Sequence, residues 1–240
     1  MTAAAVAPPR EGLPEGLEQD LAAAAFALAR RMHAGATLWA ASPAWPHHAQ
    51  HLAVEFVHPV IVGKPALPAV ALPAQDPTST ARALVRPGDV LVVIATADEP
   101  AAADLVRRAP AWGLITLWIG IGPRPPAGAA DHVLWLSGDE MAAHDGTFIL
   151  VYHLLWELAH VCLEHRGLLG PDEACDGPVC ITCSDEGRLG EVVRVSGPTA
   201  KVRTGDGLED VDLSLVGATN VHDLVVVHAG MAITRLDRRP

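Results

Sequence analysis

The segment RPGDVLVVIAT at residues 86–96 indicates how the first part of the chain folds. Its centre, Val90 to Ile94, is an uninterrupted run of branched apolar side chains between two groups of turn residues, Pro87-Gly88 and Asp98-Glu99-Pro100. A run of this length between turn signals is typical of a strand that is buried on both faces. Such strands occur mainly in parallel sheets that helices cover on both sides.

The segments around this strand alternate between apolar runs and amphipathic helices. This alternation predicts a doubly wound α/β domain with a parallel sheet. We expect helices at residues 15–34, 46–56, from about 78, 99–111 and about 140–165, and apolar runs or strands at 36–41, 67–72, 90–95, 114–119 and 132–136.

The pattern changes near Gly167, where a polar stretch with Gly and Pro indicates a linker. Beyond it, short Val-rich segments of period 2 are separated by turn signals, which favours a small all-β barrel. We expect its strands at residues 190–195, 199–204, 209–216 and 223–228. The expected organisation is a flexible N-terminus at 1–14, an α/β domain at 15–166, a linker at 167–179 and the barrel at 180–240.

Composition and charge exclude some classes of partner. The 240 residues carry a formal charge of −11 and include only two lysines, which argues against nucleic acid. The most apolar window, residues 146–163, contains His153, Glu157 and His160, so no membrane span is expected. Without a visible secretory signal, the cytoplasm is the default location. Three of the four cysteines fall between residues 175 and 183, which indicates thiolate or metal chemistry rather than disulfides.

Three segments of the second half carry a resemblance. They are CITCSDEGRLGEVVRV at 180–195, VDLSLVGA at 211–218 and DLVVVHAGMAITRLD at 223–237. In order and spacing they resemble the HypC/HupF family of [NiFe]-hydrogenase maturation chaperones. The resemblance implies a small OB-like barrel that carries iron as Fe(CN)2CO, works with a HypD-type partner, and delivers the iron to the apo large subunit of the hydrogenase.

The resemblance also assigns roles to single residues. Cys180 takes the position of the family's near-terminal cysteine, and a thiolate is a soft anionic donor that suits such an iron centre. His228 matches the histidine of the family's VHAG motif and would be a second ligand or a hydrogen-bond partner. The alternatives are a linker cysteine without a role and a packed barrel histidine. Cys183 is a second ligand, a redox partner or an idle thiol.

The first half resembles the sugar isomerase (SIS) domain, and within it the phosphoheptose isomerases. The matching segments are AQHLAVEF at 49–56, ALPAVAL at 66–72, RPGDVLVVIAT at 86–96, GLITLWIG at 113–120 and YHLLWEL at 152–158. This resemblance implies a three-layer sandwich with a parallel sheet. It also implies a homo-oligomer, because family members associate through their helices.

Catalytic positions of that family are altered. The first phosphate loop should fall at residues 41–45, but the sequence there is Ala-Ser-Pro-Ala-Trp, which has lost its glycines. The second, at residues 95–100, has lost its hydroxyls except Thr96 and gained two carboxylates, which would repel a phosphate. Phe148 stands where the family has its catalytic histidine. The sequence therefore predicts a domain without isomerase activity.

A metal site is a further candidate in this domain. His51 and Glu55 are four residues apart on one helix and can chelate one ion. The resemblance implies that a Gln and a His of the last helix complete a zinc site, and the matching residues here are Asp145 and His153. Two imidazoles and two carboxylates suit zinc or ferrous iron. The alternative is a polar helix pair without metal.

These observations favour a metallochaperone of [NiFe]-hydrogenase maturation in which the SIS-like domain serves oligomerisation, docking or metal binding. The rival hypothesis from the enzyme class is a heptose phosphate isomerase or a metal-dependent enzyme. A regulatory sensor of a metal or ligand is a third possibility.

Overall fold

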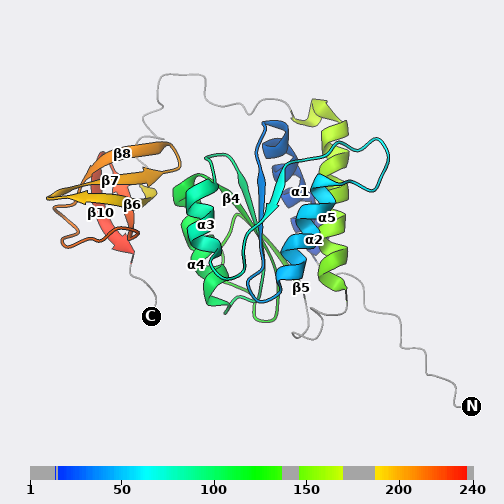
Figure 1. Cartoon of the computed structure of the whole chain (residues 1–240), viewed down its shortest axis with the longest axis horizontal. Coiled ribbons are helices and arrows are strands. Elements are labelled where there is room, and N and C mark those ends of the chain that lie inside the picture. Colours follow the sequence, from blue (N-terminus) through cyan, green and yellow to red (C-terminus); the bar gives the residue numbers. More distant parts are fainter. Residues whose placement is uncertain (1–13, 15, 137–145, 170–186, 237–240) are drawn as a thin grey trace, which may run out of the picture.

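The computed structural model describes residues 14, 16–136, 146–169 and 187–236 (Figure 1). Its first domain is an α/β sandwich, and a closed barrel lies beside α3 and α4. The helices of the first domain are α1 (Leu17–His33), α2 (Pro46–Val57), α3 (Pro77–Leu84), α4 (Pro100–Arg108) and α5 (Thr147–Glu164), with the 3-10 helices η1 (Ala109–Trp112) and η3 (Arg166–Leu169). Its strands are β1 (Leu38–Ala41), β2 (Ala69–Ala71), β3 (Val90–Ile94), β4 (Ile115–Ile121) and β5 (His132–Leu136).

The five strands form one parallel sheet in the order β2-β1-β3-β4-β5. The expected α/β class and parallel sheet are therefore confirmed. β3 lies at the centre, where Val90 pairs with Leu38 of β1 and with Ile115 of β4. The chain order reverses between β1 and β3, and in open sheets of this type a crevice forms at the carboxyl ends of the strands on either side of such a point.

The two faces of β3 belong to two different cores. Val90, Val92 and Ile94 pack in a cluster with the buried faces of α1, α2 and α5. Leu91 and Val93 pack in a second cluster with residues of α4 and η1. All five side chains are at most 1% exposed, as expected of a strand buried on both sides. This alternation makes the domain a three-layer structure.

Among the described residues, one helix, α5, is long and apolar enough to cross a membrane by length and composition alone. Its residues Val151, Leu155 and Ala159 are fully buried in the core cluster that also contains α1. Core helices of soluble proteins meet the same length and composition test. α5 acts here as a core helix that covers one face of the sheet (Figure 1).

The second domain is a closed five-strand barrel in the order β10-β8-β7-β6-β9, which confirms the expected all-β module. Its strands are β6 (Arg188–Ser196), β7 (Thr199–Thr204), β8 (Gly207–Asp212), β9 (Leu224–His228) and β10 (Met231–Leu236). The expected strand at 209–216 is wrong at its C-terminal end. After Asp212 the chain turns, because the amide of Leu213 bonds to the carbonyl of Pro198 and the amide of Val216 bonds back to Leu213.

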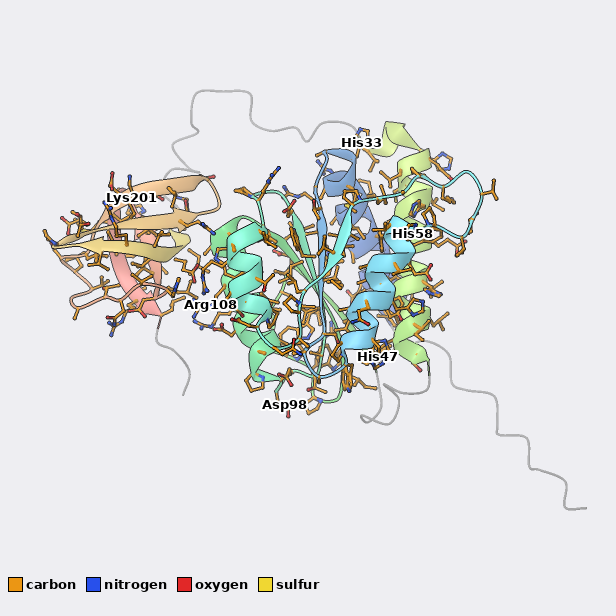
Figure 2. The ribbon with its side chains drawn as sticks, in the orientation of Figure 1. His33, His47, His58, Asp98, Arg108 and Lys201 are labelled. Atoms are coloured by element: carbon orange, nitrogen blue, oxygen red, sulfur yellow. The ribbon has the colours of Figure 1, made fainter. Side chains whose placement is uncertain are left out.

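A buried carboxylate joins the two domains. Glu191 of β6 is 1% exposed, and its oxygens accept hydrogen bonds from three side chains of the first domain. Arg82 of α3 donates from Nε and Nη2 at 2.8–3.1 Å, Arg108 of α4 donates at 2.8 Å, and Trp112 of η1 donates from Nε1 at 2.7 Å. Figure 2 labels Arg108 where α4 meets the barrel.

Backbone groups strengthen the same contact. Arg203 donates to the carbonyl of Arg82, and Arg108 donates to the carbonyl of His222, both at 2.8 Å. The turn after β7 lies against η1, where a Cβ on Gly113 would stand 3.0 Å from the carbonyl oxygen of Gly205. The two domains therefore meet in a close-packed, hydrogen-bonded interface.

Buried acidic and basic side chains are paired in this interface. Burial opposes ionisation of Glu191, but hydrogen bonds from Arg82 and Trp112 and the charges of Arg82 and Arg108 hold the pKa of its carboxyl below the ordinary value. Asp104 of α4 binds Arg108 from the other side at 2.8 Å. A buried ion pair of this kind is costly to break, because the remaining partner keeps an uncompensated charge.

We expect Glu191→Gln to lower the free energy of unfolding by about 3–5 kcal/mol, because Arg82 loses its carboxylate partner in a buried place and Arg108 keeps only Asp104. The measurement is denaturant unfolding of the full chain. The control is Glu209→Gln in the same barrel, whose half-exposed pair with Arg188 should contribute less than about 1 kcal/mol. Equal losses in both variants would contradict a special role of Glu191.

The stability difference between wild type and Glu191→Gln should depend on pH. Because the pKa of folded Glu191 is lowered, its stabilisation is complete above the ordinary value of 4.5 and is lost as the pH falls through the lowered value. Unfolding free energies of both proteins, measured from neutrality down to about pH 3, should therefore converge in acid. A difference that stays constant over this range would show that the charge of Glu191 does not carry the effect.

Candidate functional site

Side chains of the chain itself contact one another at the carboxyl end of β1, where the crevice is expected. The hydroxyl of Ser42 is buried and donates to the carbonyl of Ile94 in β3 at 2.7 Å. The hydrogen of this hydroxyl is therefore already used within the chain. The rings of Trp45 and Phe148 lie 5.5 Å apart between their centroids. These are the positions at which the sequence predicts a lost phosphate loop and a lost catalytic histidine.

The loop after β3 also provides its own anion. Glu99 accepts a hydrogen bond from the amide of Ala101 at 3.4 Å, which places a carboxylate at the N-terminus of α4. Pro100, the first residue of that helix, has no N–H to offer. The carbonyl of Ala95 accepts from the indole of Trp118 at 3.1 Å. A phosphate would meet the negative charge of Glu99 here.

The metal-ligand candidates converge between two helices. His51 and Glu55 lie on α2 and His153 lies on α5, with one ligand atom from each within 4.8 Å of the others. Nε2 of His51 is 3.1 Å from Oε1 of Glu55, and Nε2 of His153 is 3.5 Å from the same oxygen. Asp145, the fourth expected ligand, lies outside the described residues.

Two observations show that this donor set fits a cation. Nε2 of His153 is shielded from solvent and forms no hydrogen bond among the described residues, although it is close to Glu55. Glu55 is only 16% exposed, and its ion-pair partners in the described part of the chain are the two histidines, with no Lys or Arg among them. Two imidazoles and a carboxylate suit zinc or ferrous iron.

Sequence reasoning missed Tyr152, which completes this cluster. Tyr152 is fully buried, and its hydroxyl lies 2.8 Å from Nδ1 of His51. Burial raises the pKa of the phenol, and the negative charge of Glu55 raises it further, so the group stays neutral. The chain contains one tyrosine, and it directly precedes the candidate ligand His153. This position is the feature of the sequence that could have pointed to Tyr152.

Other histidines near these helices do not join the cluster. His47 is exposed on the first turn of α2 (Figure 2). His160 is buried, and its ring nitrogens lie 2.9 Å from the carbonyl oxygen of Trp156 and 3.1 Å from that of Pro65. His160 therefore attaches α5 to the segment before β2, which is a structural role.

In the barrel, His228 is the last residue of β9 and stands at a tight turn. Ala229 and Gly230 both have positive φ, at 48° and 77°, and form a two-residue connection to Met231. Val227 pairs with Arg188, the first residue of β6. Arg188, the start of β6, therefore lies beside the strand end that carries His228, and Cys180 and Cys183 lie outside the described residues.

Known proteins resemble the two domains separately. Residues 189–239 match the model of the HupF/HypC family. A phosphoheptose isomerase from Maridesulfovibrio salexigens is 30% identical over 140 residues, covering 51% of this chain and 68% of that protein.

Solved structures agree on the fold of the first domain. A phosphoheptose isomerase from Francisella tularensis has a TM-score of 0.55 at 19% identity, and one from Neisseria gonorrhoeae has a TM-score of 0.52 at 19% identity. Each match covers 63% of this chain and 88% of the other. The chain belongs to the phosphoheptose isomerase family through its α/β domain and carries a HupF/HypC family domain at residues 189–239.

Proposed function

We propose that this protein is a metallochaperone of [NiFe]-hydrogenase maturation, in which the barrel binds iron as Fe(CN)2CO and delivers it to the apo large subunit together with a HypD-type partner. The match of residues 189–239 to the HupF/HypC family carries this proposal and supports a maturation role at the coarse level. The iron unit, the partner and the delivery step are the finer part of the proposal.

Cys180 and His228 are the proposed iron ligands. A thiolate provides the soft anionic donor that low-spin iron prefers, and an imidazole adds a neutral one. Cys180 precedes Arg188 by eight residues, a chain length that spans up to about 28 Å. Arg188 pairs with Val227, the residue before His228, so this length allows the Cys180 thiolate to reach the imidazole of His228. Cys183 is an accessory thiol in this proposal.

The α/β domain serves oligomerisation, docking or metal binding in this proposal. The altered crevice, with Trp45 against Phe148 and Glu99 at the start of α4, supports a domain without isomerase activity. Exposed apolar side chains on α5, such as Leu150 and Val161, support a homo-oligomer formed through helices. The proposed location is the cytoplasm.

The second candidate function is enzymatic. It is favoured by the 30% identity to a phosphoheptose isomerase. A heptose phosphate isomerase would need a phosphate cradle and an acid-base group in the crevice, where the described residues offer Trp45, Glu99 and Phe148. Turnover of a heptose phosphate by the purified chain, abolished by a substitution in the crevice, would overturn our preference for a chaperone.

The iron ligands are tested by copurification with a HypD-type partner. Infrared spectra of the wild-type complex should contain cyanide and carbonyl bands, and Cys180→Ala should lose them because the thiolate donor is gone. Cys162→Ala, which changes a cysteine of α5, is the control and should keep the bands. His228→Ala should weaken them. Bands that survive Cys180→Ala unchanged would exclude Cys180 as the ligand.

The metal centre of the α/β domain is tested by elemental analysis after equilibration with zinc or ferrous iron. The wild type should hold about one ion, and His51→Ala, Glu55→Ala and His153→Ala should each weaken binding by at least about 10- to 100-fold, because each removes a donor. His47→Ala, an exposed histidine on the same helix as His51, is the matched control and should bind like wild type. Equal metal content in all variants would remove the site.

A further inference from the structure

Tyr152 is a buried polar side chain beside the cluster of His51, Glu55 and His153. It is not one of the candidate metal ligands, so its role there needs a separate explanation. Its hydroxyl is 2.8 Å from Nδ1 of His51, on the side of the imidazole opposite to Glu55. Its ring packs edge-on against His51 and His153, with 5.4 Å between centroids in both cases. The phenol thus contacts both candidate histidine ligands while its hydroxyl contacts only His51 among them.

Hydrogen counting fixes the direction of these bonds. A carboxylate can only accept, so Nε2 of His51 carries the hydrogen that bonds to Glu55 at 3.1 Å. In a neutral imidazole Nδ1 is then a bare acceptor, and the hydroxyl of Tyr152 donates to it. Without metal, Tyr152 therefore donates to His51, and His51 donates to Glu55.

A metal ion on Nε2 reverses the first of these bonds. Nε2 must then be bare, so the single hydrogen of the neutral imidazole resides on Nδ1 and is donated to the phenol oxygen. A hydroxyl can accept as well as donate, whereas a carbonyl could only accept and an ammonium could only donate. Tyr152 is therefore a group that can keep hold of His51 in both tautomers.

We propose that Tyr152 is a positioning residue for metal binding, which holds the His51 ring so that Nε2 faces Glu55 and His153 with and without the ion. The inference rests on the metal centre described under the proposed function. It assigns no contact between Tyr152 and the metal. Its consequence is that metal affinity depends on a single oxygen atom of a side chain that is not a ligand.

The test is Tyr152→Phe, which keeps the ring and removes the hydroxyl. Zinc and ferrous iron affinities of the full chain are measured by competition with a chromophoric chelator. We expect affinity to fall about 10- to 100-fold, the range found when a hydrogen-bond partner of a histidine ligand is removed. The control is Thr116→Val, which deletes another buried hydroxyl, bonded to Asp131 and not to this cluster; its metal affinity should stay unchanged.

A second measurement uses the fact that Tyr152 is the single tyrosine of the chain. The tyrosine doublet in the Raman spectrum of the wild type distinguishes a phenol that donates from one that accepts. It should indicate a donor without metal and an acceptor after metal is added. This readout does not require the variant to fold.

The outcomes separate this inference from the metal centre itself. Wild-type uptake of metal with unchanged affinity in Tyr152→Phe, or a Raman doublet that does not respond to the ion, would overturn the role of Tyr152 alone. Failure of the wild type to bind either metal would overturn the centre and this assignment together. Reduced affinity with the expected spectral change would support both.

Discussion

The buried carboxylate of Glu191 makes the two domains one structural unit. Its two guanidinium partners stand near the C-terminal ends of α3 and α4, and its indole partner stands in η1 directly after α4. A buried charge of this kind requires all its partners at once, so the barrel is held in one orientation. α4 follows its N-cap Glu99 at the crevice and ends at the barrel with Arg108, so it connects the two.

This arrangement separates the candidate sites. The barrel lies beside α3 and α4, whereas the cluster of His51, Glu55 and His153 lies between α2 and α5 on the other side of the sheet (Figure 1). A metal ion in that cluster would lie far from the proposed iron site of the barrel. The two proposed centres would therefore act independently of each other.

The sequence predicts those features of the fold and of the site that depend on neighbouring residues, and not those that depend on contacts between distant segments. The uninterrupted apolar run from Val90 to Ile94 and the i, i+4 spacing of His51 and Glu55 are properties of single elements. Both could therefore be predicted from a few adjacent residues. Glu191 could not, because its partners are 79 to 109 residues away and in a strand it is indistinguishable from an outward-facing polar residue. Tyr152 was missed for a similar reason, since its neighbour His51 is 101 residues away.

Comparison of two glutamates strengthens the case for a cation between α2 and α5. Glu191 is buried against two arginines, so its charge is compensated within the chain. Glu55 is also mostly buried, but the groups around it in the described part of the chain are His51, His153 and the neutral phenol of Tyr152. Burying a carboxylate without a cation is costly. A cation between the two helices would supply the charge, and the shielded Nε2 of His153, which forms no hydrogen bond among the described residues and lies 3.5 Å from Glu55, is placed to be one of its ligands.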